Sequence, residues 1–169
     1  MTNAQLVSVQ WGLFLSVVFL LPQLFFRQLT WRGATITVYF SMLAAAVFLP
    51  LGGHPSQAVQ PVPFQWIADW MRDGDIAFEQ MTLNILLFVP LGFLARHFWT
   101  MTRRQAVALG FTVSLAIEVA QLSLGHRIFD VDDLMTNTTG ALVGYGLAVA
   151  FSHAHRVPDR LRLQVRADA

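Results

Sequence analysis

The chain has 169 residues, of which 55% are hydrophobic and only 12% are charged, and its net charge is +1. A soluble domain of this size has roughly 25% charged residues, because polar side chains must cover its surface. The composition therefore excludes an ordinary soluble domain and indicates a surface that faces lipid. The small net charge gives no indication of nucleic-acid binding, and the absence of cysteine excludes disulfides and thiolate metal sites.

Five hydrophobic stretches are long enough to cross a membrane, since a hydrocarbon core of about 30 Å requires roughly 17–25 helical residues. They run over Leu6–Phe26, Ala34–Leu51, Met81–Trp99, Gln105–Leu124 and Leu134–Phe151. The first stretch lacks a basic n-region and a small-residue cleavage site, so we interpret it as a retained span and not as a signal peptide. The sequence therefore predicts an all-α, polytopic transmembrane helix bundle with about five spans.

The arginines predict the orientation of the bundle. With five spans, one side of the membrane collects nine of the eleven arginines, which are Arg27, Arg32, Arg96, Arg103, Arg104, Arg156, Arg160, Arg162 and Arg166. The other side has only Arg72 and Arg127, together with seven acidic residues. By the positive-inside rule the arginine-rich side is cytoplasmic. We therefore expect a multi-pass protein of the bacterial inner membrane, with its N-terminus outside and its C-terminus inside.

This topology divides the chain into four parts. Residues 1–52 form two N-terminal transmembrane helices, residues 53–80 an extracytoplasmic loop, residues 81–151 a three-helix core, and residues 152–169 a basic cytoplasmic tail. Within the loop, apolar residues recur at near-helical spacing, namely Phe64, Trp66, Ile67, Trp70 and Met71. This spacing predicts a short amphipathic helix in the outer interface. The helix is either a plain anchor or a lid over a polar cleft.

Polar residues of the last three spans fall at the same depth in the predicted topology. Asn84 lies near the outer end of the third span, and Asp133 and Asn137 begin the fifth. Glu118 lies about 9 Å below the outer end of the fourth span, and Gln121 is one turn nearer the surface. The sequence therefore predicts a shared polar site in the outer leaflet.

The carboxylates of this predicted site have more than one interpretation. A carboxylate at the depth of Glu118 needs a partner, and Arg127 is the nearest candidate, either in a structural ion pair or in a functional cleft. Asp130, Asp132 and Asp133 could cap a helix start or hold a divalent cation through their oxygens. Asn84 and Asn137 could link helices or contact a ligand.

Several segments resemble a known family. The run from Asn84 to Phe93 resembles the NxxxFxPxGF signature of VanZ-like membrane proteins, and Pro63 and Phe64 resemble the Pro-Phe element that precedes it. The remaining pattern follows in order and spacing, at Ser114, Glu118, Gln121, Arg127, Asp130, Asp133, Asn137 and Gly140. The resemblance covers roughly Pro61 to Gly144 and places the three-helix core in this family. It implies a link to teicoplanin resistance and to other envelope-active antibiotics and peptides, but no reaction.

Two hypotheses for the function follow. In the first, the protein is a non-enzymatic envelope factor that binds an amphiphilic ligand, either a lipid-linked cell-wall precursor or an antibiotic, at the outer leaflet. In the second, it is a membrane-embedded enzyme acting on such a lipid, with Glu118 as catalytic acid or base. The expected ligand-binding residues are Asn84, Glu118, Gln121, Arg127, Asp130, Asp133 and Asn137. We expect membrane lipid as a further partner, and no cofactor, metal or nucleic acid.

Overall fold

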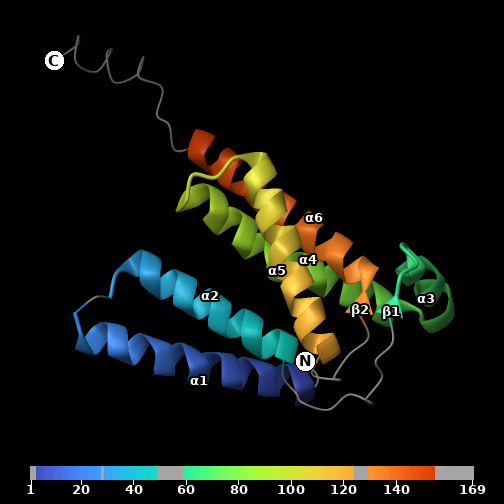
Figure 1. The fold of residues 1–169 in the computed structure, drawn as a ribbon, viewed down its shortest axis with the longest axis horizontal. Helices are drawn as coiled ribbons and strands as arrows, with labels where there is room; N and C mark the ends of the chain where they lie inside the picture. The colour runs from blue at the N-terminus through green and yellow to red at the C-terminus, as the bar shows by residue number, and fades with distance from the viewer. Residues whose placement is uncertain (1–2, 28, 49–58, 124–128, 155–169) are drawn as a thin grey trace, which may run out of the picture.

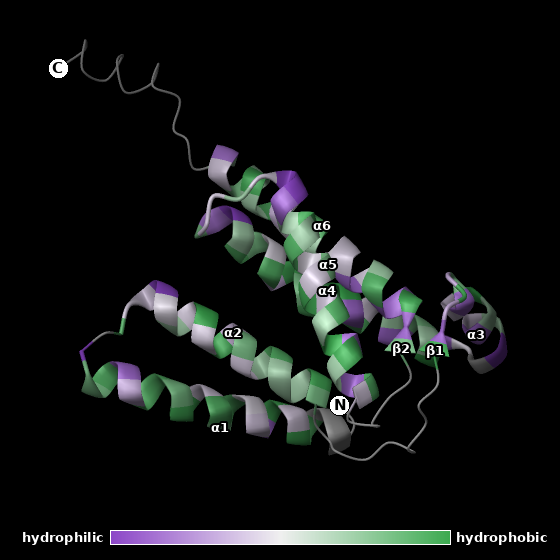
Figure 2. Cartoon of the chain, in the orientation of Figure 1, coloured by the Kyte–Doolittle hydropathy of each residue, from purple (hydrophilic) through white to green (hydrophobic). Residues whose placement is uncertain are grey.

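The computed structural model describes residues 3–27, 29–48, 59–123 and 129–154 (Figure 1). In these ranges the chain forms six helices and two short strands, in the order α1 (Asn3–Phe25), α2 (Trp31–Phe48), β1 (Val59–Gln60), α3 (Gln65–Asp73), α4 (Asp75–His97), α5 (Arg103–Ser123), β2 (Phe129–Asp130) and α6 (Val131–Ala154). All the helices except α3 are long and apolar enough to cross a membrane, and Figure 2 shows that most of their residues are hydrophobic. The predicted polytopic helix bundle is confirmed.

All five long helices begin before the hydrophobic stretches that the sequence indicated, and α4 and α6 do so with acidic first turns. Helix α4 begins at Asp75 and α6 at Val131, whereas hydropathy placed these starts at Met81 and Leu134. The additional turns contain acidic residues, which lower the hydropathy but suit the first turn of a helix, because its free N–H groups and dipole favour negative charge. The helices therefore continue past the apolar segment into more polar surroundings.

Helices α4 and α6 form the closest pair in the bundle and run in the same direction, side by side. Gly140 of α6 packs against Ile85 of α4, and one turn further on Gly144 packs against Val89. A Cβ atom built on Gly144 would overlap the Val89 carbonyl oxygen. The two backbones are therefore in direct contact, as the small-xxx-small spacing of these glycines predicts.

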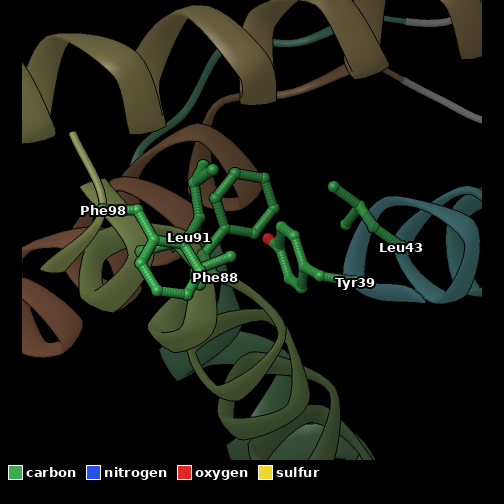
Figure 3. Packing of buried hydrophobic residues seen from close by; sticks show 6 residues of the cluster. Tyr39, Leu43, Phe88, Leu91 and Phe98 are labelled. Atoms are coloured by element: carbon green, nitrogen blue, oxygen red, sulfur yellow. The ribbon is translucent and has the colours of Figure 1, made fainter. Parts of the chain in front are cut away.

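A hydrophobic core joins α4 to α2 (Figure 3), and side chains of α5 pack against it. Phe88 and Leu91 of α4 are fully buried and face Tyr39 and Leu43 of α2. The Tyr39 hydroxyl donates a hydrogen bond to the Leu87 carbonyl at 3.2 Å. Helix α1 packs against α2, and many of its large apolar side chains remain exposed, as expected for a surface that contacts lipid.

The two ends of the bundle differ in charge. At one end the Arg32 guanidinium donates a hydrogen bond to the Phe98 carbonyl and lies 5.2 Å from the centre of the Phe98 ring, which ties the start of α2 to the end of α4. At the other end lie α3, β2 and the starts of α4 and α6, with their carboxylates. This separation of basic from acidic residues agrees with the predicted topology, in which successive loops lie at alternate ends of the bundle. Which end faces the cytoplasm stays a prediction.

The loop between the second and third spans contains the predicted short helix, α3, and an element that the sequence did not indicate. Strand β1 pairs in parallel with β2, with Val59 beside Phe129 and Gln60 beside Asp130. Each strand has only two residues, which is too short to show the alternation of apolar and polar residues by which a sequence indicates a strand. The strand pair nevertheless positions the chain before α3 next to the start of α6 (Figure 1).

Candidate functional site

The carboxylate of Glu118 fixes the strand that precedes α6. Glu118 is only 1% exposed and shares the buried face of α5 with Ser114 and Gln121, as the i, i+4, i+7 spacing predicts. Its Oε2 accepts a hydrogen bond from the backbone N–H of Asp130 at 3.0 Å. A buried carboxylate requires such donors, since removing its charge from water is otherwise very costly. Arg127, the partner predicted from the sequence, lies outside the described residues.

Two aspartates stabilise helix starts. The Oδ1 of Asp130 accepts the backbone N–H of Asp132 at 2.8 Å, which caps α6 from the residue before it. Asp132 is only 6% exposed and caps a different helix. Its Oδ1 accepts the backbone N–H of Phe64 at 2.6 Å, and its Oδ2 accepts that of Trp66 at 3.1 Å. The acidic cluster therefore holds the start of α3 against the start of α6.

Side-chain amides link the last three spans. The Asn84 Nδ2 of α4 donates a hydrogen bond to the Asp133 Oδ1 of α6. The Asn137 Nδ2 of α6 donates to the Ser114 Oγ of α5 at 2.9 Å. These contacts are the interhelical hydrogen bonds that polar residues in membrane spans typically form. Gln121 is further away, where its Nε2 donates to the Val47 carbonyl of α2 at 3.0 Å.

A pocket of about 410 Å³ opens beside these aspartates, among α3, β2 and the first turns of α4 and α6. Its walls combine acidic, basic, amide and apolar side chains, and consist of Trp66, Asp69, Arg72, Ile76, Ala77, Gln80, Met81, Asn84, Asp130, Asp132, Asp133 and Thr136. The Arg72 guanidinium lies 2.8 Å from the Asp69 carboxylate. The pocket is therefore a polar hollow with apolar margins at the acidic end of the bundle.

The pocket includes some of the residues predicted for the site and leaves others out. Asn84, Asp130 and Asp133 line it, whereas Glu118 and Asn137 do not. Sequence reasoning missed the contribution of α3, including Asp69 and Arg72, because it treated this helix only as an anchor or a lid. Among the described residues, no group of three or more His, Asp or Glu side chains is arranged to hold a metal ion.

Asp130 has an altered acidity. Desolvation by burial raises the pKa of its carboxyl, the hydrogen bond from the Asp132 N–H lowers it, and the charges of Asp132 and Asp69 raise it further. The net effect is an increase, so the folded chain binds this proton more tightly than the unfolded chain.

The raised pKa of Asp130 gives a prediction about pH. The preference for the protonated form favours the folded state at low pH, and this contribution is lost as the pH rises from the ordinary aspartate pKa through the raised one. We expect Asp130→Asn to flatten the pH dependence of thermal stability in that window, measured by the unfolding temperature of the purified chain in detergent. The Asp75→Asn variant is the control, because Asp75 is exposed and is not among the charges that raise the Asp130 pKa. An equal flattening there would contradict the assignment to Asp130.

Comparison with known proteins identifies the family. The family model described as VanZ/LLP1 matches residues 34–152, which extend from α2 to near the end of α6 and include the pocket and its hydrogen bonds. Searches of curated proteins and of solved structures gave no match. Because the family model matches well over half of the chain, this membrane protein belongs to the VanZ/LLP1 family.

Proposed function

We propose that this protein binds the polar part of an amphiphilic molecule in the pocket beside α3, at the outer leaflet of a bacterial inner membrane. The ligand is a lipid-linked cell-wall precursor or a lipoglycopeptide antibiotic. By binding it, the protein acts as a non-enzymatic envelope factor that protects against teicoplanin-type glycopeptides. The link to resistance comes from the family, and the outer location comes from the distribution of the arginines.

The observation that carries this proposal is the combination of a polar pocket with an amphipathic helix on its rim. The pocket offers carboxylates, two amides and a guanidinium, which suit sugar hydroxyls, amines and amides. Helix α3 presents exposed apolar side chains beside it, with Ile67 at 37%, Trp70 at 46% and Met71 at 82% exposure. A ligand with a polar head and an apolar tail would match both surfaces, since pockets typically fix orientation with a few polar groups.

The geometry gives less support to the enzyme hypothesis with Glu118 as acid or base. Glu118 is almost completely buried and is not part of the pocket wall. Its Oε2 accepts the Asp130 N–H. A general acid or base must come within hydrogen-bond distance of the proton it transfers. We therefore assign Glu118 a positioning role, in which it fixes the β2 strand and the start of α6 beside the pocket.

Protection of a susceptible bacterial host tests the proposal. Ala77 lines the pocket and Ala116 lies on the exposed surface of α5, so Ala77→Phe fills the pocket and Ala116→Phe adds the same side chain elsewhere. We expect Ala77→Phe to lose most of the protection against a lipoglycopeptide at unchanged protein abundance, while Ala116→Phe retains it. Glu118→Gln keeps an acceptor oxygen for the Asp130 N–H, and we expect it to protect nearly as well as the wild type.

Two results would oppose the proposal in different ways. Full protection by Ala77→Phe at normal abundance would show that the pocket is not the binding site. A complete loss of protection in Glu118→Gln, at normal abundance and with unchanged thermal stability, would favour the enzyme hypothesis, because that variant keeps the shape of the side chain and removes its ionisable carboxyl group.

A further inference from the structure

A second hollow begins at the opposite end of the bundle, where α5 starts, and extends toward α6. It is a groove of about 510 Å³ along α5, lined by Arg103, Arg104, Val107, Ala108, Phe111 and Thr138. Its wall is mainly apolar, with two arginines at one end. These arginines begin α5, whose start has the hydrophilic colour in Figure 2. No carboxylate is among the described residues that line it. The groove thus has an apolar interior and a positively charged mouth.

Local packing explains why the groove exists. On the neighbouring face of α5, Ala106 and Gly110 are buried, and a Cβ built on Gly110 would come close to the Ala141 side chain and lie 3.7 Å from the Thr138 Cα. This close crossing of α5 and α6 leaves a crevice beside it. The small side chain of Ala108 lies on α5 between the arginines and Phe111, which is 46% exposed. The Thr138 hydroxyl donates to the Leu134 carbonyl at 2.6 Å and so is occupied by its own helix.

Hydrogen bonds define where α5 begins, and therefore where the two arginines lie on the helix. The Gln105 Oε1 accepts the backbone N–H of Thr102 at 2.9 Å, and the Thr102 Oγ1 accepts the N–H of Gln105 at 3.4 Å, which is a capping box. Arg103 and Arg104 therefore belong to the first helical turn, where the helix dipole adds positive potential. Both side chains are exposed. A phosphate group at the mouth of the groove would meet two guanidinium groups and the positive end of a helix.

We infer that this groove binds an anionic phospholipid of the surrounding bilayer, with its phosphate at Arg103 and Arg104 and one acyl chain along Val107, Ala108 and Phe111. The charge of the mouth matches an anionic headgroup, and the apolar wall matches a hydrocarbon chain. Each arginine near a membrane surface strengthens binding of an anionic lipid by about five-fold. The inference is independent of the function proposed for the pocket.

Fluorescence quenching by spin-labelled lipid tests the inference. The chain has no cysteine, so Thr112→Cys provides a single position for a fluorophore. This position is exposed and adjacent to Phe111. The labelled full chain is reconstituted into bilayers containing phosphatidylglycerol or phosphatidylcholine with a nitroxide on the acyl chain. We expect roughly 25-fold stronger association of phosphatidylglycerol, about five-fold from each arginine, so Arg103→Gln and Arg104→Gln should each reduce the preference by about five-fold.

Two further variants separate a groove site from general surface charge. Arg27 lies in the turn after α1 and does not line the groove, so Arg27→Gln removes the same charge elsewhere and should leave the preference unchanged. Ala108→Leu fills the groove, keeps both arginines and should weaken association of phosphatidylglycerol. Three results would each overturn the inference. These are equal quenching by the two lipids, a loss of preference in Arg27→Gln as large as in Arg103→Gln or Arg104→Gln, and unchanged association of phosphatidylglycerol in Ala108→Leu.

Discussion

Gly144→Ala is expected to push α6 away from α4 and to destabilise the whole bundle. A Cβ atom at this position would overlap the Val89 carbonyl oxygen and lie only 2.9 Å from the Phe93 backbone nitrogen. Both are backbone atoms, so no side-chain rotation can make room. Overpacking typically costs about 1–3 kcal/mol, and we expect the upper part of this range. The free energy of unfolding in a reversible SDS titration measures the effect.

The same helix contains a matched control for this prediction. Gly146 is exposed, and a Cβ built on it has nothing within 4 Å. Gly146→Ala therefore makes the same chemical change two residues away without a steric clash, and we expect a stability within about 0.5 kcal/mol of the wild type. If the two variants lost equal stability, the effect would come from replacing a helical glycine in general, and the tight contact between α4 and α6 would be refuted.

Much of the fold could be predicted from the sequence because the signals are local. A run of about twenty apolar residues is sufficient to indicate a membrane-spanning helix. Helical periodicity also predicted that Ser114, Glu118 and Gln121 share one face, and all three are buried. The spacing of Gly140 and Gly144 predicted a close helix contact, although the sequence alone did not identify α4 as the partner.

The contacts that shape the pocket could not be predicted in the same way. Asp132 bonds to Phe64 and Trp66, which are 68 and 66 residues away in the chain. The sequence predicted the acidic cluster at a helix start, and Asp132 does lie in the first turn of α6. The helix that its side chain caps, however, is α3. Pairing of β1 with β2 likewise joins distant segments. Such partners depend on the packing of the spans, which hydropathy and spacing do not determine.

Asp132→Ala is expected to release the start of α3 from α6 while leaving the long spans folded. The substitution removes both acceptors of the Phe64 and Trp66 N–H groups. An unpaired buried donor costs about 1–3 kcal/mol, and these two hydrogen bonds are partly buried, so we expect the lower part of this range for each. A helix of only nine residues is marginal without tertiary support. Hydrogen exchange of the backbone amides of α3 should therefore become at least ten-fold faster, measured by mass spectrometry on the chain in lipid nanodiscs.

Asp69→Ala provides the control, because it removes the same charge from the same pocket. The Asp69 contact with Arg72 joins neighbouring turns of α3 at an exposed position, and such ion pairs contribute about 0–1 kcal/mol. We expect the exchange of α3 to change little in this variant. Unchanged exchange in Asp132→Ala would mean that other contacts hold α3 in place. Faster exchange together with loss of lipoglycopeptide protection would connect the position of α3 to ligand binding, since α3 supplies Trp66, Asp69 and Arg72 to the pocket wall.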